Sequence, residues 1–337
     1  MPTASMNVAI IGAGLSGTTA ARTLAAAGFS VCVLEKSRGA GGRMATRRNS
    51  EQLHFDHGAQ YFTLRDPRFV ACGKEWENRG LIALWKGRIV EWTEGGLIDK
   101  TNDERYVATP AMNVLCKEMI EDIPLKTEAE VRTLERHEDR WRLISSDQNT
   151  LCEADWVIST APAEQTAAIM PHSSIILEAA AQVKMLPCWA AMVAPEKSLE
   201  SIPLDGAFIN DGPLRWVARN SSKPGRDQAR EAWVLHAAAD WSKLHWEDSR
   251  ESIAADLWQR WCSMQGIEAG KPAFATAHRW RYALAESVFA GRSLIDPPLR
   301  LAACGDWCGG PRVEGAYLSG LEVAERLLQT LSPKVET

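Results

Sequence analysis

Three closely spaced glycines near the start of the chain could hold a diphosphate. Gly12, Gly14 and Gly17 follow the apolar run at residues 8–11 in the pattern Gly-x-Gly-x-x-Gly. In this pattern the first glycine permits a tight turn, the second lets the backbone approach a pyrophosphate, and the third lets the next helix pack against the strand. The pyrophosphate then lies on the free N–H groups at the positive end of that helix. The spacing therefore predicts a dinucleotide site.

Two further elements must position this turn, and the sequence supplies both. Residues 16–27 are typical of a helix that stops at Gly28. A second apolar run, residues 31–34, ends in Glu35, at about the ~20-residue spacing where a carboxylate binds a ribose hydroxyl. Strand, helix, strand and acid fall in the expected order. That context favours a dinucleotide fingerprint over a tight turn that binds nothing.

Composition limits the class of protein. At 337 residues the chain is too long for one ordinary core, so we expect two domains. A net charge of -5 argues against a nucleic-acid partner. We see neither an apolar run near the ~18 residues of a membrane span nor a signal peptide in residues 1–6. We therefore expect a cytoplasmic protein without a membrane partner, of undetermined oligomeric state.

Cysteine and tryptophan usage adds two expectations. The eight cysteines form no Cys-x-x-Cys pair, and no histidine cluster has metal-ligand spacing, so we expect reduced thiols and no metal. For the closest pair, Cys304 and Cys308, two buried thiols are favoured over a regulatory disulfide. Fourteen tryptophans against four tyrosines indicate either core packing or a stacking wall for a flat ligand.

Two more segments could contact a nucleotide. The glycine-rich loop at residues 36–44 carries Arg38 and Arg43, and Arg43 could pair with a phosphate; an ordinary loop with surface arginines is the alternative. Near the end of the chain, the short apolar strand 301–304 closes in Gly-Asp, and a helix begins at about residue 312. Asp306 could accept a ribityl hydroxyl, and the helix start could stabilise negative charge on a reduced cofactor ring.

The rest of the chain alternates between helical and extended patterns. We expect helices over 67–79, 111–123, 248–265 and 312–331, and strands within 82–92, 130–136, 140–145 and 155–162. The last of these strands ends in small residues and proline, which suits a backbone turn beside a ligand.

Together these segments resemble the flavoprotein amine oxidase superfamily. The likeness rests on the fingerprint with Glu35, Gly-Gly-Arg at 41–43, Ser-Thr-Ala-Pro at 159–162, and the terminal Gly-Asp with its helix. More narrowly, three motifs resemble the renalase family, especially its bacterial members: Asp56-His-Gly-Ala-Gln-Tyr61, Ala277-His-Arg-Trp280 and Cys304-Gly-Asp-Trp-Cys-x-x-x-Arg-Val-Glu-Gly-Ala316. The resemblance extends over nearly the whole chain.

The resemblance implies an α/β fold in two parts. A Rossmann-type FAD-binding domain, like those of glutathione reductase and amine oxidases, would comprise residues 1–65, 125–165 and 295–337. An inserted α+β substrate domain with a mixed antiparallel sheet would comprise 66–124 and 166–294. FAD would bind non-covalently, because Cys308 does not lie in the motif that tethers flavin in many monoamine oxidases.

The resemblance also implies an activity. Renalase-like proteins oxidise misreduced dihydro isomers of NAD(P)H to NAD(P)+ by hydride transfer to the flavin, and O2 is reduced to H2O2. An amine oxidase, or another FAD-dependent oxidoreductase of the same superfamily, is the alternative. A flavin or dinucleotide sensor without enzymatic activity is the third possibility.

Carried over by position, the resemblance assigns site residues. The expected FAD contacts are Gly12, Gly14, Leu15, Ser16, Gly17, Glu35, Lys36, Arg43, Met44, Gln60, Tyr61, Phe62, Val131, Thr160, Asp306, Val313, Glu314 and Ala316. Because hydride transfer between two rings needs stacking and alignment, we expect an aromatic wall at the substrate site. Its candidates are Tyr61, Trp189, Trp216, His278 and Trp280, with core packing as the alternative for each tryptophan and a hydrogen-bonded core histidine as the alternative for His278. Trp189 aligns near the position where many amine oxidases carry a lysine, and Lys184 is out of register, which argues against an amine substrate.

Overall fold

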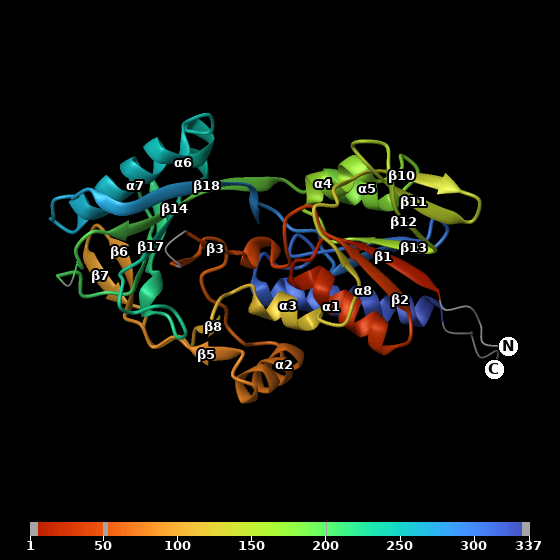
Figure 1. Cartoon of the computed structure of the whole chain (residues 1–337), viewed down its shortest axis with the longest axis horizontal. Coiled ribbons are helices and arrows are strands. Elements are labelled where there is room, and N and C mark those ends of the chain that lie inside the picture. Colours follow the sequence, from red (N-terminus) through yellow and green to blue (C-terminus); the bar gives the residue numbers. More distant parts are fainter. Residues whose placement is uncertain (1–5, 50–52, 200, 332–337) are drawn as a thin grey trace.

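The computed structural model describes residues 6–49, 53–199 and 201–331. A six-stranded sheet organises the first half of the molecule (Figure 1). Its strands are β1 (Asn7–Ile11), β2 (Ser30–Leu34), β9 (Leu125–Lys126), β13 (Trp156–Ser159), β19 (Ser293–Asp296) and β20 (Leu301–Cys304). The order is β19-β20-β13-β1-β2-β9, and only β19 is antiparallel to its neighbour. The carboxyl ends of the parallel strands therefore meet at one edge of the sheet.

Both faces of this sheet are covered, which explains its continuous apolar strands. One face carries α1 (Leu15–Ala26), α3 (Val114–Met119) and α8 (Val313–Leu331), which share a core with Val8 and Ile10. The other face, with Ala9 and Ile11, packs against a second layer. That layer consists of the three-stranded sheet β10 (Val131–His137), β11 (Arg140–Ser145) and β12 (Thr150–Ala154) with helices α4 (Ala163–Ile169) and α5 (Ile175–Ala181).

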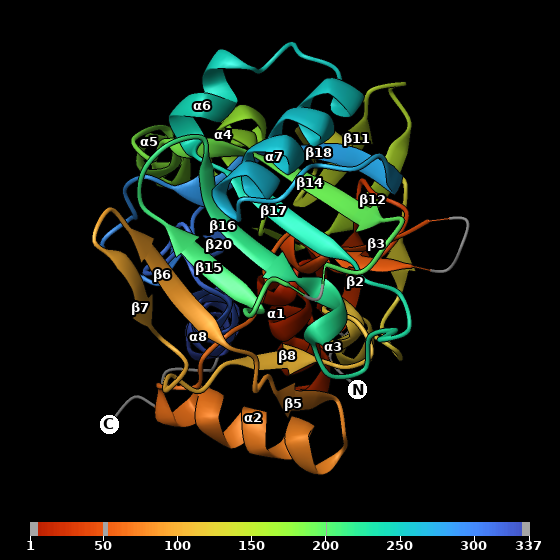
Figure 2. The same cartoon turned by 90° about the vertical axis from the view of Figure 1, so that its left-hand side faces the viewer.

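A seven-stranded sheet organises the second half (Figure 2). Its strands are β6 (Ile89–Thr93), β7 (Gly96–Asp99), β14 (Met185–Pro195), β15 (Gly206–Ile209), β16 (Leu214–Arg219), β17 (Trp233–Ala237) and β18 (Pro272–Ala285). The order is β18-β14-β17-β16-β15-β6-β7, and only β6 and β15 pair in parallel. Helix α7 (Arg250–Met264) packs on one face around Trp233 and Trp261, with α6 (Ala239–Leu244) beside it.

Short elements join the two halves. They are the hairpin β3 (Thr46–Arg48) and β4 (His54–Asp56), helix α2 (Pro67–Asn78), the pair β5 (Ile82–Leu84) and β8 (Tyr106–Ala108), and two 3-10 turns at Gly42–Met44 and Asn220–Ser222. Asp66 caps α2 by accepting a hydrogen bond from the Arg68 N–H (3.0 Å), and Pro67 occupies the first helical position. Phe69 of α2 then packs against Tyr317 of α8.

The predicted fold class is confirmed: a Rossmann-like parallel sheet is combined with a mixed, mostly antiparallel one. Most expected elements lie within one or two residues of their predicted bounds. The helix expected over 111–123 is shorter, because α3 ends at Met119. Pro124 follows closely and leads into β9, and a proline disfavours helical backbone in the residue before it.

The segment 66–124, which we expected in the substrate domain, is divided in the structure. Its strands β6 and β7 join the seven-stranded sheet, whereas α2 and α3 share a core with α8 and α1. The domain boundaries remain a prediction. Of residues 1–6, on which the absence of a signal peptide was argued, 1–5 lie outside the described residues, as do 332–337 of the expected FAD-binding domain.

Among the described residues, no helix combines the length and apolar character that crossing a bilayer requires.

Candidate active site

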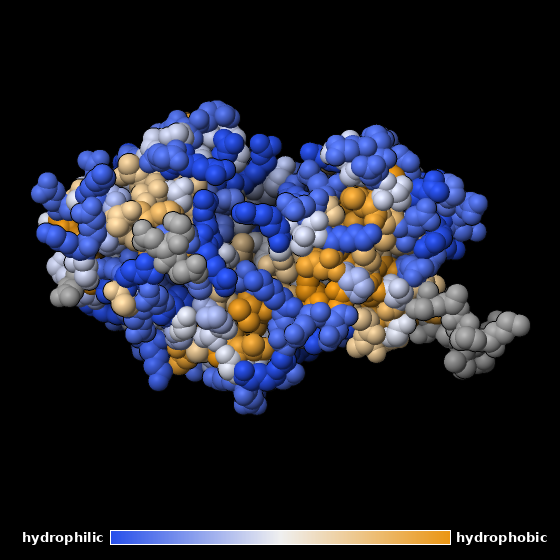
Figure 3. Space-filling view, in the orientation of Figure 1, coloured by the Kyte–Doolittle hydropathy of each residue, from blue (hydrophilic) through white to orange (hydrophobic). Residues whose placement is uncertain are grey.

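A long cleft of about 2630 Å³ runs along the carboxyl edge of the parallel sheet and across the seven-stranded sheet. Its lining comes from both halves, from the turn after β1 to strands β16 and β18. On the face shown in Figure 3, hydrophilic residues cover most of the second half, and apolar residues gather around β1 and α1.

The turn after β1 has the geometry that its glycines predict. Gly12 has a φ of +105°, a conformation that favours glycine, and its N–H donates to the Leu34 carbonyl oxygen (2.8 Å). A Cβ on Gly17 would collide with the Gly12 carbonyl oxygen, so α1 can approach the strand only through glycine. The Thr160 hydroxyl fixes the turn by donating to the Ile11 carbonyl oxygen (2.9 Å).

Gly14 differs from these two glycines because nothing in the protein requires it. Its φ is an ordinary −76°, and an added Cβ would meet only the Gly42 Cα, at 3.8 Å. No side chain caps α1, whose first N–H groups lack intrahelical acceptors. Gly14, Leu15 and Ser16 line the cleft, so these N–H groups and the positive helix end are available to an anion there.

Glu35 is held by the backbone before any ligand binds. One carboxylate oxygen accepts a hydrogen bond from the Ala13 N–H (2.8 Å), and the other accepts from the N–H and hydroxyl of Ser37 (2.8 and 2.7 Å). The side chain lines the cleft at the end of β2. The acid that the fingerprint requires is therefore oriented by the same turn that would hold the pyrophosphate.

Arg43 and Asp306, both expected at the cofactor, pair with each other. The guanidinium forms a bidentate ion pair with the carboxylate, with N–O distances of 2.8 and 2.5 Å. Both residues line the cleft. The Glu314 carboxylate, at the start of α8, accepts from the N–H groups of Arg65 and Asp66 (2.7 and 3.0 Å). These charges fix the loops around the cleft.

A buried charge cluster lies behind the cleft and joins its two halves. Asp56 is completely buried and pairs with Lys223 (3.4 Å) and Arg226 (2.7 Å), which come from the turn after β16. Although burial alone raises the pKa of the Asp56 carboxyl, the two cations lower it to about 2. Burial also lowers the pKa of the Lys223 ammonium to about 8, even though Asp56 favours its charged form.

This cluster determines the orientation of the Gln60 amide. The Lys223 ammonium donates to the Gln60 Oε1 (3.1 Å), and the Gln60 Nε2 donates to the carbonyl oxygens of Asp56 and Gly58. The amide is therefore bonded within the protein, although Gln60 lines the cleft.

We call the part of the cleft along the parallel sheet the cofactor half and the part across the seven-stranded sheet the substrate half. One wall of the substrate half consists of imidazole and indole rings. His57 stacks on Trp280 (5.1 Å between ring centroids), and His278 meets both edge-on. The His57 carbonyl oxygen accepts from the Trp280 Nε1 (2.9 Å) and the His236 Nε2 (3.1 Å). Burial lowers the pKa of all three histidines to about 4. These imidazoles are therefore uncharged at neutral pH.

The second wall of the substrate half is also aromatic. Trp216 on β16 lies between Tyr61 (5.5 Å) and Phe208 (4.6 Å between centroids). The buried guanidinium of Arg105 lies over Tyr61 at 5.3 Å and pairs with Asp103 (3.0 Å). Strand register links Phe208 and Trp216 to His236 and His278 on the same face of the seven-stranded sheet, so the two walls form one continuous aromatic surface.

Most of the predicted site residues meet in this one cleft. The lining includes the expected FAD contacts other than Gly17, which supports the turn from behind, and four of the five expected wall residues. Trp189 is the exception: its side chain is 1% exposed and packs in the core beneath α7. Its Nε1 donates to the His245 carbonyl oxygen (3.0 Å). Strand alternation turns Trp189 away from the cleft, so expecting it in the wall was wrong.

Sequence reasoning missed four residues of the two walls: His57, Arg105, Phe208 and His236. His57 was within reach, because it follows Asp56 in a motif already singled out. Phe208 and His236 carry no local signal, since only strand pairing brings them to the cleft. Arg105 precedes β8 in a segment without a motif. Cys304 and Cys308 are confirmed as buried free thiols.

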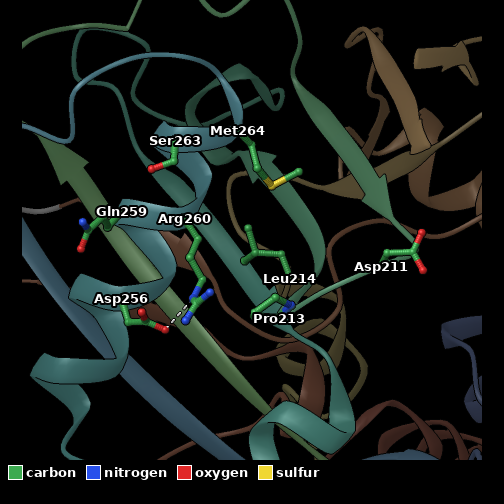
Figure 4. A pocket seen from close by; sticks show the side chains of 8 residues that line it. All are labelled: Asp211, Pro213, Leu214, Asp256, Gln259, Arg260, Ser263 and Met264. Atoms are coloured by element: carbon green, nitrogen blue, oxygen red, sulfur yellow. Dashed lines mark hydrogen bonds and ion pairs between the residues drawn. The ribbon is translucent and has the colours of Figure 1, made fainter. Parts of the chain in front are cut away.

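A smaller hollow of about 450 Å³ lies between α7 and the start of β16 (Figure 4). Asp211, Leu214 and Met264 line it, and Arg260 in its wall pairs with Asp256 (2.8 Å). No aromatic ring is among its described lining residues, so we place the chemistry in the larger cleft.

Comparisons with known proteins agree with this geometry. The fold and cleft define a dinucleotide-binding oxidoreductase with two sheets. The model of an NAD(P)-binding Rossmann-like domain matches residues 10–71, and the model of the flavin containing amine oxidoreductases matches residues 97–328. Because the second match covers more than half of the chain, the protein belongs to the flavin containing amine oxidoreductase family.

Relatives and solved structures define the likeness further. An L-amino-acid oxidase of Vipera ammodytes ammodytes is 54% identical over 46 residues, 14% of this chain and 10% of the oxidase. A 4,4'-diapophytoene desaturase of Staphylococcus aureus is 37% identical over 76 residues, 22% of this chain and 15% of the desaturase. This chain thus spans at most 15% of either relative.

Two solved structures match over nearly full length. Cyclohexylamine oxidase from Brevibacterium oxydans has a TM-score of 0.75 at 13% identity, covering 97% of this chain and 99% of that one. Putrescine oxidase bound to putrescine has a TM-score of 0.70 at 15% identity, covering 97% and 100%. At such low identity the likeness shows the shared fold alone.

FAD is the cofactor of this protein, and the cleft fits it. The uncapped end of α1 and the open side of Gly14 suit a diphosphate, and the oriented carboxylate of Glu35 suits a ribose. Lys36, Met44, Phe62, Val131, Val313 and Ala316 complete the expected lining of this half. Cys308 is fully buried in the core and does not line the cleft, in keeping with non-covalent binding.

Proposed function

We propose that this protein is an FAD-dependent oxidase similar to renalase that oxidises misreduced dihydro isomers of NAD(P)H. One dihydro isomer, one O2 and one proton give one NAD(P)+ and one H2O2. Bound FAD supplies the hydride acceptor and the reaction with O2. One observation carries the proposal: the substrate half presents a continuous aromatic surface, and the imidazoles in it are uncharged at neutral pH.

The walls have the properties that hydride transfer from a planar ring requires. Such transfer depends on alignment and exclusion of water more than on a general acid or base. Trp280 is fixed by its hydrogen bond to the His57 carbonyl oxygen and by its stack on the His57 ring. Tyr61 is fixed between Trp216 and the Arg105 guanidinium. Rigid rings can hold a nicotinamide in one plane.

Neutral imidazoles also suit the charge change of this reaction. Loss of a hydride leaves a positive charge on the nicotinamide ring. A protonated histidine in the wall would repel that charge in a site of low dielectric constant. Burial keeps His57 and His278 unprotonated at neutral pH, so the wall does not oppose product formation.

Amine oxidation is the second candidate, favoured by the family and by the fold shared with two amine oxidases. The lysines in the described lining are Lys36 and Lys117, which lie beside the cofactor-half loops. Lys184 pairs with Glu286 (3.0 Å) outside the cleft. The described part of the substrate half therefore shows no lysine, which favours a flat aromatic substrate.

Visible spectra of the anaerobic protein test the proposal. Separated 2- and 6-dihydro isomers of NADH and NADPH should bleach the flavin band at once, while purified 1,4-NADH bleaches it slowly. Putrescine and cyclohexylamine are added in separate experiments as candidate amine substrates. Bleaching by an amine but by no dihydro isomer would establish the second candidate instead. A flavin that every donor leaves oxidised would indicate a sensor.

A further inference from the structure

The substrate half of the cleft contains arginines that its aromatic walls do not explain. Arg47 on β3 and Arg250 at the start of α7 both line the cleft, although they are far apart in the sequence. Both are close enough to His278 to lower the pKa of its imidazole. Two guanidinium groups thus line the same cleft as the His278 imidazole.

Neither arginine has a structural use among the residues described. Within 6–49, 53–199 and 201–331, no carboxylate pairs with Arg47 or Arg250, and neither guanidinium bonds a backbone carbonyl. Two other arginines of the lining differ in this respect: Arg279 donates to the Trp246 carbonyl oxygen (2.5 Å), and Arg105 pairs with Asp103 (3.0 Å). Structural contacts therefore account for Arg105 and Arg279 but leave the two rim arginines unused.

The position of Arg250 is unfavourable for a helix alone. It is the first residue of α7, where the positive end of the helix dipole disfavours a cation. Arg47 adds a second like charge to the lining of the same cleft. An anion bound between them would remove both penalties, and Arg matches phosphate oxygens with paired N–H donors.

We propose that Arg47 and Arg250 form a phosphate-binding subsite that holds the diphosphate of a dinucleotide substrate while its ring lies against the His278 and Trp280 wall. This inference rests on the proposed function and specifies the substrate as phosphate-bearing. The same charges repel small cationic amines. A phosphate-free dihydronicotinamide would bind by its ring alone.

The test measures binding, independently of turnover. NAD+, nicotinamide mononucleotide and 1-methylnicotinamide are titrated into the oxidised FAD-loaded protein, and Kd is read from the shift of the flavin spectrum. Arg47→Ala and Arg250→Ala should each raise Kd for NAD+ about tenfold, and the double variant about 100-fold. The Kd for 1-methylnicotinamide, a cation without a phosphate, should not rise, because the arginines can only repel it. Nicotinamide mononucleotide shows whether one phosphate is enough for the effect.

Two controls separate the subsite from general effects. Arg260→Ala removes the same charge from the same helix, but that side chain pairs with Asp256 and lines the separate hollow, so Kd for NAD+ should stay at the wild-type value. The double lysine variant keeps both charges and should recover part of the affinity. Equal FAD content and Tm show that the variants fold.

The outcomes distinguish this inference from the proposed function. An unchanged Kd for NAD+ in the double variant, or a wild-type protein that binds no NAD+, overturns the subsite. If dihydro isomers bleach the flavin of the double variant at wild-type half-saturation, the subsite is wrong and the proposed function stands. If NAD+ binding depends on both arginines but no isomer bleaches the wild-type flavin, the proposed function fails and the subsite stands.

Discussion

The two halves of the cleft are built by different means. The cofactor half is made of backbone: the turn at Gly12 to Ser16 presents N–H groups, and Glu35 is held by backbone donors. The substrate half is made of side chains: rings on β16 and β18 form its walls around His57 and Tyr61. The first arrangement is local in the sequence, and the second depends on strands that pair over long distances.

This difference determines what each half tolerates. A backbone cradle fails when a side chain fills the space of the ligand, even if the protein itself has room for it. A side-chain wall fails when a ring tilts, and neighbouring rings can compensate in part. We therefore expect cofactor-half substitutions to act on FAD retention and substrate-half substitutions to act on rate.

The largest effect should follow Gly14→Val. The folded protein accommodates a Cβ at this position, because the nearest atom is 3.8 Å away and φ is ordinary. The added side chain would instead occupy the space of the diphosphate, so we expect FAD affinity to fall more than about 100-fold. The absorbance ratio of flavin to protein after gel filtration measures this loss.

Gly270→Val is the matched control, since an added Cβ there meets nothing within 4 Å and the residue lies outside the cleft. Both variants should keep the far-ultraviolet circular dichroism of the wild-type apoprotein. A Gly14→Val protein that remains yellow and fully loaded with FAD would show that the cofactor half does not depend on the open space at Gly14.

The cluster that joins the two halves should give the next largest effect. Asp56→Asn leaves Lys223 and Arg226 buried with no counter-charge among the described residues. We expect the free energy of unfolding to fall by about 3–5 kcal/mol, measured by urea denaturation at pH 7. Asp227 is an exposed acid in the turn that carries Lys223 and Arg226. Asp227→Asn is therefore the control, and it should change the free energy of unfolding little.

Asp56 also predicts the direction of acid sensitivity. Its folded pKa of about 2 lies below the ordinary value of 3.8, so the carboxylate stabilises the fold above pH 3.8. This contribution is lost as pH falls from 3.8 towards 2, and the Asp56→Asn variant lacks that part of the loss. Urea midpoints across this range should therefore converge between wild type and variant at low pH; parallel curves would contradict the assignment.

The same contrast explains how far the sequence could be read. The turn at Gly12, the acid at Glu35 and the strand before Asp306 were predictable, because each depends on residues that are neighbours in the chain. The walls were only partly predictable. Tyr61, His278 and Trp280 were found as motif residues and Trp216 as a candidate ring, whereas Phe208 and His236 reach the cleft only through the pairing of β15, β16 and β17.

Trp189 shows the physical reason for the misses. On β14 its neighbours Ala191 and Val193 face the core beneath α7, while Met192 and Ala194 face the opposite side. A shift of one residue in register would exchange the two faces. An apolar strand buried on both sides carries no polarity signal to show which face meets the cleft.

The smallest and sharpest test applies the same substitution to two tryptophans on neighbouring strands. Trp280→Phe loses the hydrogen bond to the His57 carbonyl oxygen and part of the stack on its ring, so flavin reduction by a dihydro isomer should slow about tenfold with FAD content unchanged. Trp189→Phe loses its bond to the His245 carbonyl oxygen in the core, so the free energy of unfolding should fall by about 1–3 kcal/mol with the reduction rate unchanged. Stopped-flow spectra and urea denaturation measure the two quantities in parallel.

If Trp189→Phe slowed reduction as much as Trp280→Phe, the substrate half would extend through the sheet, and the division into a side-chain wall and a separate core would be wrong.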